Sequence, residues 1–204
     1  MVSALTWLVP LALGWLALTW FFWRAGAWLP YFVVGSTGFA LLTVITARDV
    51  IPMDLWLRVA TAHAVNSSAT VFGLQTSMST ADAGSLLVIG VPHHNEWTLL
   101  SIGLECSGLL ESAALAGLVV FYPAQSTSRR AGILVIALAA TFVANIVRMM
   151  VIVTAVAWFG QGALDVAHVV LGRIVFFFLA IGIYWFAITR PTLATVNARI
   201  RASR

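Results

Sequence analysis

Three residues of this chain have side chains that together could carry out acyl transfer: Cys106, Arg148 and His168. A cysteine is a strong nucleophile as the thiolate, a form that a neighbouring histidine or arginine favours. A histidine can take the thiol proton and return it to a leaving amine. An arginine stays charged and can donate hydrogen bonds to the oxyanion of a tetrahedral intermediate. These residue types therefore supply the parts for chemistry through a thioester.

The composition places this trio in a membrane protein. Hydrophobic residues make up 61% of the 204 residues, charged residues 9%, and the mean hydropathy is +0.99. Soluble domains carry about 25% charged residues, so an ordinary soluble enzyme, a disordered protein and a free nucleic-acid binder are excluded. All eleven basic residues are arginines, and the basic pI is not a sign of a nucleic-acid partner. The single cysteine rules out an intramolecular disulfide.

The apolar stretches predict an all-α bundle of about five transmembrane helices, since each crossing needs about 20 apolar residues. The candidate spans are residues 2–23, 27–47, 101–121, 131–158 and 169–189. A sixth is possible at residues 55–72, but Arg58, His63 and Asn66 argue against it. Asp54 and Arg58 at i,i+4 indicate an amphipathic helix on the outer surface instead, with an apolar face at Leu55, Val59, Ala62 and Ala69.

The segment between the second and third spans is the only one with strand character. Its short apolar runs at 71–74 and 86–89 predict a small extracytoplasmic cap resembling a β-hairpin. We therefore expect one polytopic domain over residues 1–204. Its expected parts are two N-terminal spans (1–47), the amphipathic helix and cap (48–100), a three-helix catalytic core (101–189) and a basic cytoplasmic tail (190–204).

The arginines orient these spans, because short cytoplasmic loops collect positive charge. Arg129 and Arg130 follow the third span and four arginines follow the fifth, so both places and the C-terminus are expected in the cytoplasm. Cys106 then lies about 7 Å below the outer end of the third span, and Arg148, seventeen residues after Ala131, about 26 Å up the fourth. With His168 just before the fifth span, all three residues are expected at the outer face.

Each residue also has an ordinary structural interpretation. A cysteine in a membrane helix often only fills space, and a histidine at a helix start often caps it. An arginine near a helix end can extend to the headgroups. The coincidence of all three at one depth favours a site over these alternatives.

Three motifs give the site a family resemblance. They are Glu-Cys-Ser-Gly at 105–108, Asn-Ile-Val-Arg at 145–148, and His-Val-Val-Leu-Gly at 168–172 followed by Phe176. In order and spacing they resemble the motifs of the exosortase/archaeosortase family, over about residues 50–190. The resemblance implies a membrane cysteine protease or transpeptidase with Cys106 as nucleophile, His168 as acid/base and Arg148 as transition-state stabiliser, without a cofactor or metal.

The resemblance also implies the partners and the location. Such enzymes cleave, on the outer side of the plasma (inner) membrane, exported proteins whose C-terminal signal combines a short motif, a membrane helix and a basic cluster. The expected partners are these substrates and membrane lipids, with no nucleic acid. The alternatives are a hydrolytic endopeptidase with the same three residues, or a non-enzymatic scaffold or small transporter, although no polar track crosses the predicted spans.

Several neighbours are candidates for supporting roles. Glu105 either orients His168, contacts substrate or is a solvated interfacial carboxylate. Asn145 either holds the Arg148 guanidinium or a substrate carbonyl, or makes a hydrogen bond between helices. Asp165 either orients the imidazole or caps a helix.

Four further residues are expected to have structural roles. Ser107 and Gly108 are expected to let another backbone approach the thiol. Glu111 and Arg173, each about five residues inward from Cys106 and His168, are expected to form a structural ion pair. His93, His94 and Glu96 lack a second ligand cluster, so no metal site is predicted there.

Overall fold

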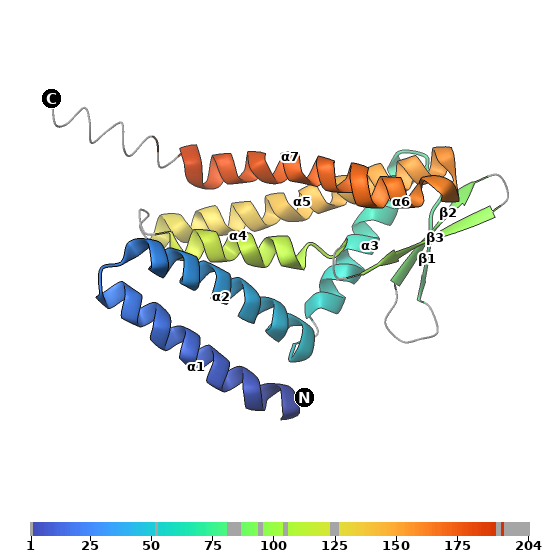
Figure 1. Ribbon diagram of the computed structural model, residues 1–204. Coiled ribbons are helices and arrows are strands. Elements are labelled where there is room, and N and C mark those ends of the chain that lie inside the picture. The colour runs from blue at the N-terminus through green and yellow to red at the C-terminus, as the bar shows by residue number, and fades with distance from the viewer. Residues whose placement is uncertain are drawn as a thin grey trace. The chain divides into compact units, whose positions relative to one another are not determined.

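The computed structural model describes residues 2–51, 53–80, 87–93, 96–103, 106–122, 127–190 and 193. The chain separates into two compact units, each discontinuous in sequence. Unit 1 comprises Met1–Pro52, Leu110–Ala140 and Ile181–Arg204, and unit 2 comprises Met53–Leu109 and Thr141–Ala180. The elements, shown in Figure 1, are α1 (Val2–Arg24), α2 (Trp28–Asp49), α3 (Met53–Val71), β1 (Ser77–Thr80), β2 (Leu87–His93), β3 (Glu96–Ile102), α4 (Leu109–Phe121), α5 (Thr127–Phe159), η2 (Gln161–Ala163), α6 (Leu164–Val166), η3 (Ala167–Leu171), α7 (Gly172–Tyr184) and η4 (Trp185–Thr189).

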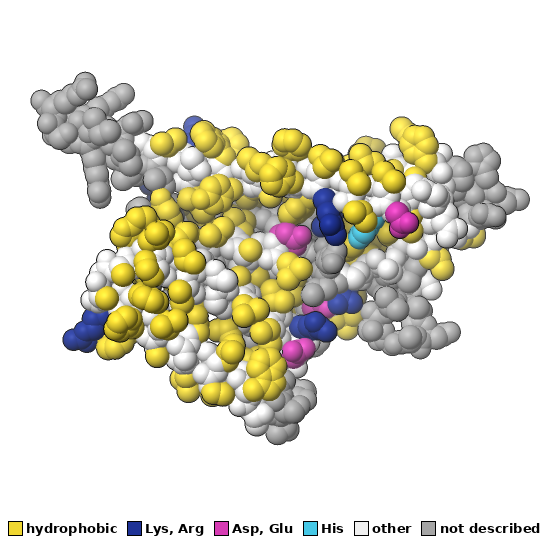
Figure 2. Space-filling model, viewed as in Figure 1, with side chains coloured by type: hydrophobic (Ala, Val, Ile, Leu, Met, Phe, Trp, Pro, Cys, Tyr) yellow, Lys and Arg dark blue, Asp and Glu magenta, His cyan; other side chains and the backbone are white. Residues whose placement is uncertain are grey.

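Within the described residues, four helical stretches are long and apolar enough to cross a membrane: Thr6–Arg24, Trp28–Asp49, Arg129–Phe159 and Gln161–Thr189. Large hydrophobic side chains are exposed along them, and Figure 2 shows hydrophobic side chains over much of the face in view. Such a surface suits lipid, because the exposure of apolar side chains to hydrocarbon carries none of the free-energy cost that exposure to water carries. The protein is therefore an integral membrane protein, as its composition predicted.

The third expected span is wrong in its bounds. Residues 101 and 102 belong to β3, and the helix that follows, α4, has 13 residues. At 1.5 Å per residue it is about 20 Å long, shorter than a hydrocarbon core of about 30 Å. Hydropathy could not separate the apolar end of a strand from the start of an apolar helix.

Unit 2 is built on a three-stranded antiparallel sheet in the order β1-β2-β3. Ile89 pairs with Leu100 and Val91 with Thr98, and all four side chains are buried. The alternate residues of β3 are exposed, as the two-residue period of a strand requires. The segment between α3 and α4 therefore does contain strands, but the expected strand at residues 71–74 is wrong because α3 extends to Val71.

The helix α3 lies alongside this sheet (Figure 1). It confirms the helix predicted at residues 55–72, and the Asp54–Arg58 ion pair is present. Ala62 and Ala69 are fully buried, but Leu55 is 45% exposed although the pattern grouped it with them. Asp54 is buried, so the ion pair is part of the packed interior rather than of a solvated face.

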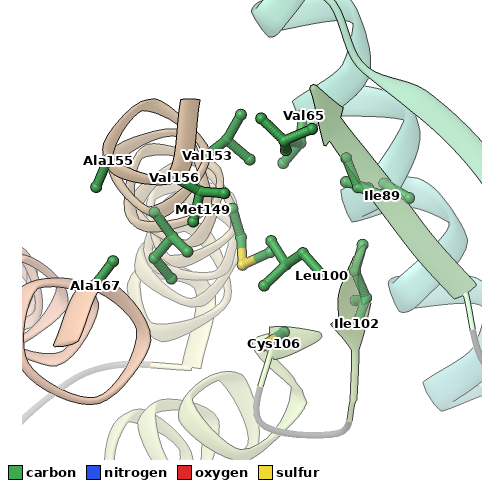
Figure 3. Packing of buried hydrophobic residues seen from close by; sticks show 13 residues of the cluster. Val65, Ile89, Leu100, Ile102, Cys106, Met149, Val153, Ala155, Val156 and Ala167 are labelled. Atoms are coloured by element: carbon green, nitrogen blue, oxygen red, sulfur yellow. The ribbon is translucent and has the colours of Figure 1, made fainter. Parts of the chain in front are cut away.

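One buried apolar cluster joins α3, the sheet, the second half of α5 and η3. Figure 3 shows these side chains converging, with Cys106 at the edge of the cluster. From α5 the cluster takes a helical face that repeats every three or four residues, at Met149, Ile152, Val153 and Val156. The cysteine turn is thus packed against a continuous core.

Unit 1 holds the hairpin of α1 and α2, together with α4 and the first half of α5. The Trp15 indole on α1 donates a hydrogen bond to the Val34 carbonyl of α2 over 2.9 Å. The Phe121 ring of α4 lies 5.8 Å from the Trp15 ring and 5.7 Å from the Tyr31 ring. Arg130 donates to the Val120 and Tyr122 carbonyls, which satisfies acceptors at the C-terminal end of α4.

Within unit 1, α2 and α4 approach each other closely at Gly117. A Cβ added to Gly117 would lie 2.5 Å from the Ser36 backbone oxygen. Membrane helices commonly have such small residues at their contacts. In lipid no hydrophobic driving force holds helices together, so their association depends on close van der Waals packing, which small residues allow. Gly117 is therefore required by the close approach of two backbones.

We expect Gly117→Ala to destabilise the protein by about 1–3 kcal/mol, because the new methyl group forces backbone apart from backbone. Gly132→Ala on α5 is the matched control: nothing lies within 4 Å of its added Cβ. It should leave stability unchanged or raise it by up to about 1 kcal/mol, as glycine is a poor helix former. Thermal unfolding midpoints in one detergent measure both; equal midpoints would contradict the close contact.

Candidate active site

Cys106 lies in a 3-10 turn between β3 and α4, not inside an α-helix as expected. Its backbone N–H donates to the Gly103 carbonyl over 3.0 Å. The Ser107 hydroxyl accepts a hydrogen bond from the Leu109 N–H over 3.2 Å, where α4 begins. This is the local bonding by which serine favours turns and helix starts. Cys106 is 2% exposed, so the turn presents its thiol to the protein interior.

Asn145 on α5 holds this turn from the side. Its Nδ2 donates to the Cys106 carbonyl over 2.8 Å, and the residue is fully buried. Of the roles that the sequence left open, the structure shows a hydrogen bond between elements. Gly108 adjoins this amide: its φ of +72° suits glycine, and an added Cβ would lie 3.3 Å from the Asn145 Cγ and Nδ2. Gly108 thus makes room for a side chain rather than for another backbone.

Arg148 is one turn further along the same face of α5, and it is 4% exposed. Its guanidinium carbon lies 5.8 Å from the centre of the Phe176 ring on α7. The negative face of an aromatic ring attracts such a cation, more strongly where water is absent. The ring therefore helps to hold Arg148 in place within unit 2.

His168 lies in a π-helical turn, η3, inside a helical run that begins at Gln161. The expected helix start at residue 169 is therefore wrong. Single π-helical turns are rare and occur often at functional sites. His168 is partly buried, and the preceding residue, Ala167, is fully buried in the same cluster as Cys106 and Met149. Unit 2 thus contains all three residues of the predicted site.

A profile of the transmembrane exosortases matches residues 2–186 of the chain. The chain belongs to this family. No curated protein and no solved structure matched it. The match begins well before the residue 50 at which the expected resemblance started. It contains all three motifs, the whole of unit 2, and unit 1 except for residue 1 and residues 187–204. The short helix α4 and the small sheet are therefore parts of an exosortase.

The supporting residues of this exosortase fall in different places. Asp165 is exposed inside α6, where Ala163 precedes the helix, so it does not cap it. No hydrogen bond between described residues joins it to His168. Glu111 belongs to unit 1 and Arg173 to unit 2, and their ion pair stays a prediction.

Other candidates lie outside the described part of the chain. These are Glu105 and His94, together with the side chains of His93 and Glu96. Among the side chains that are described, no group of three or more His, Cys, Asp or Glu residues could hold a metal ion.

Two features of the exosortase site escaped the sequence analysis. Phe176 was noted only as part of a motif, and its position over Arg148 depends on how α5 and α7 pack in unit 2. The π-helical turn has no signal in hydrophobic periodicity, which follows the α-helical repeat. For Phe176 the available signal was its spacing of eight residues from His168, about two helical turns.

We expect Gly108→Ala to loosen the cysteine turn, because alanine at a φ of +72° costs about 1–3 kcal/mol and its methyl group would press on Asn145. The variant should unfold at a lower temperature, and Cys106 should be alkylated faster by N-ethylmaleimide. Gly103→Ala is the control, since its Cβ would meet nothing within 4 Å and its φ is not positive. Equal alkylation in the two variants would contradict the geometry.

Proposed function

We propose that this exosortase is a membrane cysteine protease or transpeptidase that cleaves C-terminal sorting signals of exported proteins. The observation that carries the proposal is the hydrogen bond between Asn145 and the Cys106 carbonyl, one helical turn from Arg148. It brings the chain's single cysteine to the α5 face that bears a buried arginine. Membership of the exosortase family supports an enzymatic role for this arrangement.

In the proposed reaction the Cys106 thiol loses its proton to His168, and its sulfur attacks the carbonyl carbon of the scissile peptide. Arg148 donates hydrogen bonds to the oxyanion that forms. His168 then returns the proton to the leaving amine nitrogen as the C–N bond breaks, leaving a thioester. An amine or water attacks this thioester, the acyl group leaves sulfur, and the thiol is restored.

The proposed substrate is an exported protein whose C-terminus carries a short motif, a hydrophobic helix and an arginine cluster. Its helix would lie in the same bilayer as the long apolar helices of the enzyme. The scissile bond would reach Cys106 at the outer face of the plasma membrane, with the arginine-rich tail of the enzyme on the cytoplasmic side. The arginine distribution supports this orientation.

Replacing the nucleophile tests the proposal. We expect Cys106→Ala and Cys106→Ser to abolish cleavage of an exported reporter that bears the C-terminal signal of a protein encoded beside this one. Both variants should still accumulate in the membrane. Ser101→Ala, at an exposed position of β3, should cleave at the normal rate. Cleavage by Cys106→Ala at the wild-type rate would refute the proposal in favour of a scaffold or transporter.

Mass spectrometry of the new C-terminus then identifies the acceptor. An added amine-linked group means that an amine attacked the thioester and the enzyme is a transpeptidase. A free carboxylate means that water attacked, and the enzyme is an endopeptidase with the same nucleophile.

The role of Arg148 depends on its planar guanidinium. We expect Arg148→Lys to lower the cleavage rate about 10²–10³-fold, the usual effect of losing one oxyanion donor. Phe176→Leu should lower it about 2- to 30-fold, since it removes only the ring under the cation. Phe177→Leu, at a position 60% exposed, is the matched control and should have the wild-type rate. A Phe176→Leu enzyme indistinguishable from this control would remove the ring from the mechanism.

A further inference from the structure

Asn145 is buried at a cost that its packing does not explain. An asparagine amide has two N–H donors and an oxygen with two lone pairs. Among the described residues this one makes a single hydrogen bond, to the Cys106 carbonyl, and its Oδ1 is buried without a partner. A buried unsatisfied polar atom costs about 1–3 kcal/mol, whereas an apolar side chain of the same size would carry no such cost. The contribution of the buried amide therefore comes mainly from its one hydrogen bond to the Cys106 carbonyl.

The Asn145 bond joins residues much farther apart in the sequence than the other hydrogen bonds described at the cysteine turn. The contacts from Cys106 to Gly103 and from Leu109 to Ser107 are local, spanning two or three residues. The bond from Asn145 spans 39 positions of the chain and joins the turn to α5. Local bonds give the turn its shape, but a bond to another element is needed to fix where the turn lies.

The same helix face also fixes the arginine. Asn145 and Arg148 are three residues apart on α5, about 4.5 Å along the axis, and both are almost completely buried. A helix is stiff over one turn, so the Asn145 bond, together with the apolar packing of Cys106 in the same cluster as Met149, sets the position of the Cys106 backbone relative to the Arg148 backbone. Catalysis by oriented groups is sensitive to such spacing, and a displacement of about 1 Å can lower a rate about 10²-fold.

We propose that Asn145 is a positioning residue that holds the Cys106 turn in register with Arg148. The proposal rests on the proposed function, since it names the residue that sets the distance between nucleophile and transition-state stabiliser. Asn145 does not touch the substrate; it acts through the Cys106 carbonyl. Gly108 is the complementary part, because a Cβ there would lie 3.3 Å from the Asn145 Cγ and Nδ2 and would press the amide away from its present place.

The test compares Asn145→Leu, which keeps the volume, with Asn145→Asp, which keeps the shape but replaces the N–H donor by an acceptor. Single-turnover cleavage is measured in membranes with enzyme in saturating excess over substrate, because at saturation the rate constant does not depend on the fraction of enzyme that is folded. We expect both variants to be about 10²-fold slower than wild type. Thr141→Val, one turn earlier on the same buried face, is the control and should remain within about twofold of wild type.

A second measurement separates this proposal from the proposed function. The rate of Cys106 alkylation by N-ethylmaleimide requires no substrate. In Asn145→Leu the time course of alkylation should remain a single phase, and its rate constant should rise at least several-fold. The reason is that the released turn exposes a thiol that is 2% exposed in the wild type. If the wild type cleaves no reporter, the proposed function fails, while the alkylation rates still decide the role of Asn145. A wild-type alkylation rate in Asn145→Leu, or a saturating single-turnover rate constant within twofold of the wild type, would overturn the positioning role.

Discussion

The burial of an amide and a guanidinium on one face of an apolar helix constrains the rest of unit 2. Neither Asn145 nor Arg148 can face hydrocarbon cheaply, because a polar group without a partner there costs several kcal/mol. The Cys106 carbonyl accepts from the amide, and the Phe176 ring lies beside the guanidinium. The hydrogen bond from Asn145 thus holds the cysteine turn against α5, and the cation–π contact of Arg148 holds α7 against it.

The sheet and α3 make this arrangement possible by enclosing the turn. Leu100 and Ile102 of β3 bring the chain directly from the buried core to Cys106, and alanines on α3 let that helix approach the sheet. An apolar enclosure of this kind lowers the local dielectric constant. Interactions between a fixed cation and a developing oxyanion are stronger there than in water, and they require no solvent reorganisation.

The sequence predicted long apolar helices well and short elements poorly, for a physical reason. In α1, α2 and α5, mostly apolar stretches of 22 or more residues leave the helix as the only structure that satisfies the backbone in lipid. Residues 101–106 are too few to show a period, so a strand and a turn were taken for a helix. The motif order predicted one site for Cys106, Arg148 and His168, which all belong to unit 2, but the partners of these residues depend on packing. No pattern along the chain specifies that Asn145 meets a carbonyl 39 positions away.

The position of Cys106 in a turn has a consequence for how such a site is built in a membrane. A cysteine within a helix takes its direction from that helix, and its backbone carbonyl is already used by the residue four positions later. In the turn, the Cys106 carbonyl is available to Asn145, so a neighbouring helix can hold the proposed nucleophile through its backbone. The π-helical turn at His168 likewise departs from the α-helical repeat. A membrane helix bundle therefore obtains an oriented site where its chain leaves the regular α-helix, while the regular stretches supply the anchoring.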